Sequence, residues 1–203
     1  QQRSAFAAPL VPDPHRRRAR EDGPAAAVPD DWSAFGCRGV GLRANPADAT
    51  RIVLEIRRSH EEWPAAAVWN HPLGRRGRLS LQIRLHPGSA GLRALLTDHF
   101  SVPFDPEDAH ESLYALRLVP AADATSARQA PAVRGEVAIA VEVDRWLDLE
   151  IRWDCDERSA VAAVQGGATV SLPLRRLGDG VCYLRVKPVA EGVDAGFCVG
   201  QAE

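Results

Sequence analysis

Several features that would assign this chain to a particular class of protein are missing from its sequence. No apolar run reaches about 18 residues, the length at which a segment is expected to span a membrane, so no membrane span is predicted. No Cys-x-x-Cys or Cys-x-x-His pair occurs, which argues against a structural zinc site. Lysine is represented by Lys187 alone, and the formal net charge of -2 provides no basic field that would indicate a nucleic-acid partner.

Cysteine is scarce, and the cysteines are far apart along the chain. We expect buried free thiols rather than disulfides, although disulfides stay possible on sequence grounds. Cys182 and Cys198 fall in two strand patterns near the end of the chain, on opposite faces relative to their apolar neighbours, so a bridge between them would need a bulge. The four residues are Cys37, Cys155, Cys182 and Cys198.

The N-terminal part differs in composition from the rest. Residues 1–31 contain five prolines, the run HRRRAR and few large apolar side chains, which predicts an extended arm or linker. No aromatic residue interrupts the basic run, and Glu21 and Asp22 follow it, so a solvated linker is favoured over an anion-binding patch. The domain boundaries are therefore expected at 1–31 for the arm and 32–203 for the folded domain.

From residue 32 onward, apolar residues recur with a period of two. The stretch LSLQIRLH, residues 79–86, alternates leucine or isoleucine with polar residues, which is typical of a strand with one buried face. Residues 51–58, 112–119, 136–143, 146–153, 181–187 and 196–200 follow the same pattern, and Gly166 and Gly167 indicate a hairpin. About nine or ten short strands without a long helix predict an all-β fold of antiparallel strands with one face in water, which is either a two-sheet β-sandwich or a barrel.

The C-terminal third carries a resemblance to a known family. The segments LDLEIRWDCDERSAVAAVQGGATVSLPL and GDGVCYLRVKPVAEGVDAGFCVGQ, within residues 147–201, resemble the ending of concanavalin A-like jelly-roll sandwiches attached to sialidase-like secreted glycosidases. The resemblance extends over about residues 75–201. It implies a jelly-roll fold, a glycan or a glycosidase catalytic domain as partner, and an extracellular or secreted location. The S-x-D-x-G-x-x-W box of the sialidase propeller occurs nowhere in the chain.

Some sandwiches of this superfamily are themselves glycan hydrolases, with three carboxylates at alternate positions of one strand. The nearest patterns here are Glu142 with Asp144 and Asp148 with Glu150, and both lack the third carboxylate. Charged residues at alternate positions are more often the wet face of a sheet, so neither pair is a strong catalytic candidate.

The stretch LTDHFSVPFDPEDAHE, residues 96–111, concentrates acids and histidines. We expect first a structural loop, in which Asp105 caps a helical turn begun by Pro106. A second interpretation is a cation site with calcium as the cofactor, and a third is catalysis by Asp98 with His99. Adjacent residues of a strand face opposite sides, which makes Asp98 and His99 poor partners for proton transfer. The metal ligands would be Asp98, Asp105, Glu107 and Asp108.

Three tryptophans are candidates for stacking on a sugar ring: Trp63, Trp69 and Trp146. Trp146 is expected on the polar face of its strand, where it would either stack on a sugar ring or be covered by the N-terminal arm, whereas Trp153 shares a face with leucines and belongs to the core. The leading hypothesis is a non-catalytic β-sandwich that binds or orients glycans beside a glycosidase catalytic domain. The alternatives are a glycan hydrolase or lyase with its site near Asp98 and His99, and a structural interaction domain without a small ligand.

Overall fold

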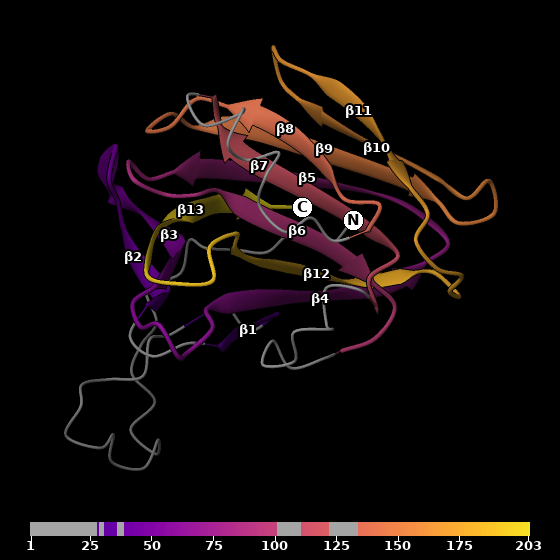
Figure 1. Ribbon diagram of the computed structural model, residues 1–203, viewed down its shortest axis with the longest axis horizontal. Helices are drawn as coiled ribbons and strands as arrows, with labels where there is room; N and C mark the ends of the chain where they lie inside the picture. The colour runs from indigo at the N-terminus through magenta and orange to yellow at the C-terminus, as the bar shows by residue number, and fades with distance from the viewer. Residues whose placement is uncertain (1–27, 29–30, 36–38, 101–110, 122–133) are drawn as a thin grey trace.

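A computed structural model provides the structure of the chain, of which residues 28, 31–35, 39–100, 111–121 and 134–203 are described here. These residues form thirteen strands and no α-helix. The strands make two sheets packed face to face (Figure 1), which confirms the predicted all-β sandwich. The count exceeds the expected nine or ten because strands such as Trp32–Phe35 are very short and others, such as Ala66–Gly74, do not alternate regularly between buried and exposed residues.

The two sheets have six and seven strands. The order in the first is β1 (Trp32–Phe35), β4 (Ala66–Gly74), β12 (Val181–Pro188), β6 (Leu92–Thr97), β7 (Tyr114–Pro120) and β8 (Val137–Val141). The order in the second is β11 (Thr169–Pro173), β10 (Ser159–Val164), β9 (Leu147–Asp154), β5 (Arg76–Leu85), β13 (Asp194–Ala202), β3 (Asp48–Arg58) and β2 (Val40–Asn45). All described neighbours are antiparallel except β7 and β8.

The core lies between the sheets and follows the period-two pattern of the sequence. On β5, Leu79, Leu81, Ile83 and Leu85 are buried, while the residues between them point to the outer face of the seven-stranded sheet. Trp153 is 6% exposed and belongs to the same core, as its face of β9 predicts. The hairpin at Gly166 is confirmed, because β10 and β11 pair across it.

The outer face of the six-stranded sheet differs from the expectation of one wet face per strand. Every residue of β6 and β7 is buried, including Arg93 and Arg117. Both guanidinium groups contact Glu136, whose side chain is fully buried, with Arg117 Nε 3.0 Å from Glu136 Oε2. Charged groups are buried only when they are paired in this way. The pairing with Glu136 therefore allows the two arginines to lie in the interior.

The cysteines of the described residues are free thiols, as expected. Cys155, Cys182 and Cys198 form no disulfide, and Cys37 lies outside the described residues. Cys182 and Cys198 were expected on opposite faces of one sheet. They lie in different sheets, because β12 belongs to the six-stranded sheet and β13 to the seven-stranded sheet.

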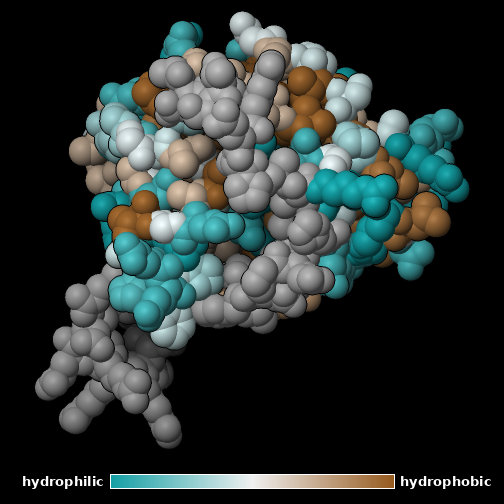
Figure 2. All heavy atoms as spheres, viewed as in Figure 1, coloured by the Kyte–Doolittle hydropathy of each residue, from teal (hydrophilic) through white to brown (hydrophobic). Residues whose placement is uncertain are grey.

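On the side of the molecule shown in Figure 2, hydrophobic side chains of the described residues form separate spots among hydrophilic ones. The described residues contain no helix of the length and apolarity needed to cross a membrane. The expected arm falls almost entirely outside the described residues, so its boundary with the domain stays a prediction.

Candidate functional site

The outer face of the seven-stranded sheet carries two adjoining grooves. One has a volume of about 450 Å³ and is lined by the end of β8 in the other sheet, the turn before β9 and the β10–β11 hairpin. The other has a volume of about 440 Å³ and runs over β5, β9 and β10. Asp148, Val164 and Gln165 line both grooves, which therefore adjoin and are together called the depression.

Trp146 stands at one wall of this depression. The turn before it contains Asp144, whose φ of 61° lies in the left-handed region that aspartate tolerates better than most residues. A β-carbon placed on Gly200 would lie 3.1 Å from the Trp146 ring, so the indole lies directly over the backbone of β13. Trp146 is half-buried, lies on the polar face as expected, and leaves part of its ring toward the first groove.

The indole N–H of Trp146 has no hydrogen-bond acceptor within the described part of the chain, although its nitrogen is buried. A buried donor without a partner costs about 1–3 kcal/mol. The turn therefore holds a buried donor that the described residues do not satisfy.

Three of the acidic side chains near this depression, Glu142, Asp144 and Glu150, are paired with arginines. Asp144 contacts Arg84, and Glu142 lies 2.7 Å from Arg145. Glu150 Oε1 lies 2.6 Å from Arg152 Nε, whereas Asp148 accepts a hydrogen bond of 3.1 Å from Gln82. The carboxylates at alternate positions are thus a polar sheet face: Arg152 follows Glu150 where a third carboxylate would fall, and Asp154 at the end of β9 lies 2.9 Å from Arg76 Nε.

The other two tryptophan candidates lie elsewhere. Trp63 is 47% exposed in the connection between β3 and β4. Trp69 is 1% exposed, stacks on Trp32 with ring centroids 6.0 Å apart, and donates its Nε1–H to Asp31 Oδ2 at 2.8 Å. The expectation of a sugar platform at Trp69 is therefore corrected, since both polar and apolar parts of this side chain are already enclosed by the protein.

Asp98 and His99 form a polar network at the end of β6. His99 Nδ1 lies 2.7 Å from Asp98 Oδ1, and His99 Nε2 lies 3.0 Å from Glu111 Oε2. The expectation that these neighbours face opposite sides is wrong, because the strand ends at Thr97 and the chain bends at both residues. The network joins two carboxylates through one imidazole, an arrangement that can hold or move a proton.

Arg176 closes this network from the segment between β11 and β12. Its Nη1 donates to Asp98 Oδ2 at 3.0 Å, and its Nη2 contacts Asp98 Oδ1. Burial raises the pKa of Asp98, but the hydrogen bonds from Arg176 and His99 outweigh this effect and hold it below its ordinary value of 3.8. Because Arg176 engages both Asp98 oxygens, this carboxylate is poorly placed as a calcium ligand. The other expected ligands, Asp105, Glu107 and Asp108, lie outside the described residues, as does the expected cap at Asp105.

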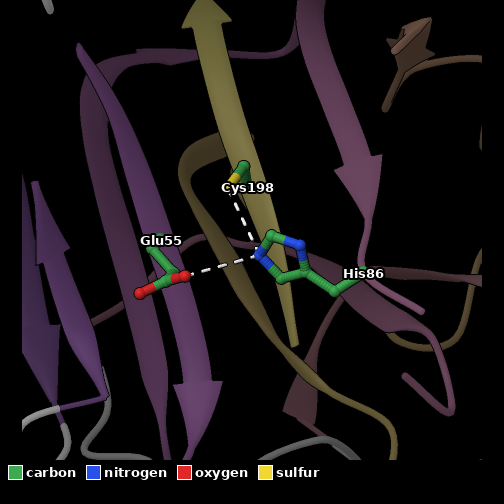
Figure 3. A group of neighbouring side chains, drawn as sticks. All are labelled: Glu55, His86 and Cys198. Atoms are coloured by element: carbon green, nitrogen blue, oxygen red, sulfur yellow. Dashed lines mark hydrogen bonds and ion pairs between the residues drawn. The ribbon is translucent and has the colours of Figure 1, made fainter. Parts of the chain in front are cut away.

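A second group of side chains on the outer face was not found from the sequence. Glu55 on β3, His86 just after β5 and Cys198 on β13 converge on one point (Figure 3). His86 Nε2 lies 3.4 Å from Cys198 Sγ and 3.5 Å from Glu55 Oε1. The sheet register creates this group, because Cys198 pairs with Glu55 on one neighbouring strand and with Arg84, two residues before His86, on the other.

The surroundings of this group affect the protonation of its members. Burial, together with the nearby Glu55 carboxylate, raises the pKa of the Cys198 thiol to about 12, while Arg84 acts in the opposite direction. The hydrogen bond with His86 lowers the pKa of Glu55, and this effect exceeds the opposing effect of burial. The group therefore contains a neutral thiol beside an ionised carboxylate.

Comparisons with known proteins show similarity of fold and not of sequence. No protein-family model matches the chain, and no curated protein is significantly similar to it in sequence. A solved sialidase shares 8% identity with a TM-score of 0.53, and the match covers 85% of this chain and 16% of the sialidase. The chain thus spans about a sixth of that protein.

Two further solved structures are similar over most of their own length. The exoplasmic/lumenal domain of VIP36, in its Ca²⁺/Man3GlcNAc-bound form, shares 11% identity with a TM-score of 0.52, over 85% of this chain and 82% of that one. A Bacteroides ovatus GH16 protein from a mixed linkage glucan PUL, in a product complex, shares 8% identity with a TM-score of 0.51, over 85% of this chain and 93% of that one. The chain has the concanavalin A-like fold that the sequence predicted.

Proposed function

We propose that this concanavalin A-like β-sandwich binds carbohydrate in the depression on the outer face of its seven-stranded sheet. The observation that carries the proposal is the half-buried Trp146 beside the two adjoining grooves. A sugar ring presents an apolar C–H face, for which an indole is a suitable platform, and a ring of hydroxyl groups, which needs polar partners. Gln82, Asp148 and Gln165 supply amide and carboxylate groups along the same depression.

The arrangement has the mixture of apolar surface and a few polar groups that small-ligand sites have in general. Glycosidic cleavage usually needs two carboxyl groups, one on either side of the bond. In the depression Glu142 and Glu150 are each paired with an arginine, so the arrangement favours binding over cleavage. The sialidase, the VIP36 domain and the GH16 protein, with names or bound groups that concern carbohydrate, support the same class of ligand.

The partner and the location follow as parts of this proposal. A module that matches only 16% of a sialidase chain is suited to work beside a larger catalytic domain, so we propose a glycosidase domain as its partner. A secreted or lumenal location would bring such a module to its glycan.

The test is a glycan array probed with the wild-type chain and with Trp146→Ala. We expect the substitution to weaken binding at least tenfold, which corresponds to about 1.4 kcal/mol. Trp63→Ala is the matched control, because it removes an exposed tryptophan that lines neither groove, and it should bind as the wild type does. Binding that depends on Trp63 and not on Trp146 would move the platform to the β3–β4 connection. An absence of binding to any glycan would favour an interaction domain without a small ligand.

A second function, cleavage of glycosidic bonds, is favoured by one observation, the chain of contacts from Glu111 through His99 to Asp98. Such a network can exchange a proton with a bound substrate. Incubation with polysaccharide mixtures, followed by detection of released reducing ends or unsaturated products, tests it. Activity that His99→Gln abolishes while Trp63→Ala leaves it intact would establish this alternative.

A further inference from the structure

The geometry of Glu55, His86 and Cys198 points to a site for a transition-metal ion of the zinc type, and we propose that the chain binds one such ion there. The three side chains come from three different places in the sequence, with His86 and Cys198 112 residues apart. They supply a carboxylate, an imidazole and a thiol, which are the ligand types that zinc takes in proteins.

Two of the three distances between the ligand atoms match those of a tetrahedral site. Zinc–nitrogen and zinc–oxygen bonds of about 2.0–2.1 Å and a zinc–sulfur bond of about 2.3 Å place neighbouring tetrahedral ligands roughly 3.3–3.5 Å apart. The separations of His86 Nε2 from Cys198 Sγ and from Glu55 Oε1 are 3.4 and 3.5 Å. The third separation, between Cys198 Sγ and the Glu55 carboxylate, is within 4.8 Å, so all three ligand atoms lie close together.

The direction of the contacts argues against a catalytic triad. In a nucleophile–histidine–acid triad the two ring nitrogens of the histidine face different partners, so that a proton passes through the ring. Here one nitrogen, His86 Nε2, faces both the thiol and the carboxylate. Three lone-pair donors aimed at a common point are the arrangement of a ligand set.

The scaffold holds the histidine and the carboxylate in place. The His86 backbone N–H donates to the Gly196 carbonyl at 3.0 Å, on a bulge of β13 next to Cys198. Arg43 Nε lies 3.6 Å from the second oxygen of Glu55, which leaves the first oxygen directed to the group. Contacts that orient metal ligands from outside the site act in this way.

The charges and exposure favour a site with one open position. An ionised Cys198 with Glu55 would carry two negative charges, which a divalent ion compensates, while Arg84 is already paired with Asp144. The side chains of His86 and Glu55 are 17% and 18% exposed, so one side of the group reaches solvent. Zinc with three protein ligands keeps the fourth position for water or for an oxygen of a ligand. Thiolate and imidazole ligands select against calcium and magnesium.

The test uses the whole chain after treatment with a chelator. Titration with cobalt(II) should give thiolate-to-cobalt charge-transfer absorption and the visible bands of a tetrahedral centre, saturating at one ion per chain, and zinc should abolish both. Cys198→Ser should remove the charge-transfer band, and His86→Gln and Glu55→Gln should weaken binding at least tenfold. Cys182→Ser is the matched control, because Cys182 is a free, half-buried thiol outside the group, and it should leave the spectrum unchanged.

A thermal melt provides a second measurement. Zinc at 100 times its dissociation constant should raise the melting temperature of the wild type by about 5–11 °C, and should not shift that of Cys198→Ser. If that variant does not fold, the spectra of His86→Gln and Glu55→Gln decide, since both side chains reach solvent. A wild-type chain without a thiolate band, or a band that survives Cys198→Ser, would overturn the proposal. Because no glycan is present, this test is independent of carbohydrate binding.

Discussion

Replacement of Asp194 by alanine should destabilise the fold more than most single substitutions. The Asp194 side chain is buried at the start of β13 and accepts three hydrogen bonds. The donors are Ser89 Oγ at 3.2 Å, the Ala90 N–H at 2.8 Å and the Gly196 N–H at 2.6 Å. Hydrogen bonds to charged groups contribute about 1.5–3 kcal/mol each, and the substitution leaves two backbone N–H groups without a partner.

The three bonds share one side chain and are not additive, so we expect a loss of about 3–5 kcal/mol. For a chain of 203 residues this lowers the melting temperature by roughly 6–20 °C. Urea denaturation followed by tryptophan fluorescence measures the free energy of unfolding, and an unchanged slope would show that the unfolded state is unaffected.

Asp194→Asn is the matched variant, because it keeps the shape and one acceptor oxygen while turning an amide toward one of the donors. It should lose about 1–3 kcal/mol, between the wild type and the alanine variant. A loss below about 1 kcal/mol for Asp194→Ala would refute the argument, since water would then have to satisfy both backbone groups in a buried position.

Two further predictions concern charged groups. Glu136→Gln should cost about 3–5 kcal/mol in urea denaturation, because it leaves two buried arginines beside a neutral amide, and a cost near zero would show that their charge is compensated elsewhere. Asp98 has a folded-state pKa below its ordinary 3.8, so its contribution to stability is fully present above pH 3.8 and is lost as the pH falls through the folded-state value. Arg176→Gln should therefore flatten the stability curve of the chain in this acid range, whereas an unchanged curve would show that the pair does not couple to folding.

The fold class could be predicted from the sequence because period-two alternation is visible in a few neighbouring residues, without any knowledge of long-range contacts. Residues 79–86 show it most clearly, and β5 occupies almost the same range. Alternation reports only which side of a sheet a residue faces, and not whether that side is wet. Arg117 was therefore expected in water, whereas the pairing of Arg93 and Arg117 with Glu136 allows both to be buried.

The candidate sites depend on information that no local pattern contains. Trp146 could be assigned to the polar face from its neighbours, but its position over Gly200 follows from the pairing of β5 with both β9 and β13. Asp98 and His99 were placed on opposite sides because a continuous strand was assumed, and a bend of two residues was enough to bring them together. Their network could be recognised only once the end of β6 at Thr97 was known.

The proposed metal ligands lie beyond sequence reasoning for a different reason. Zinc sites are recognised from short spacings between cysteine and histidine, and the absence of such spacings argued against one. Glu55, His86 and Cys198 are brought together by the order of strands β3, β13 and β5. A ligand set assembled across a sheet leaves no spacing to detect.

The placement of β12 and β13 inside the two sheets has a consequence for how the chain reaches its fold. β13 pairs with β3 and β5, and β12 pairs with β4 and β6, so strands made early have no inner partner until residues 181–202 arrive (Figure 1). Until then the earlier strands have edges with unpaired backbone N–H and C=O groups. Such edges can pair with strands of other chains and lead to aggregation. Such a protein is expected to fold slowly, and only once residues 181–202 are available, since its contacts join distant parts of the sequence.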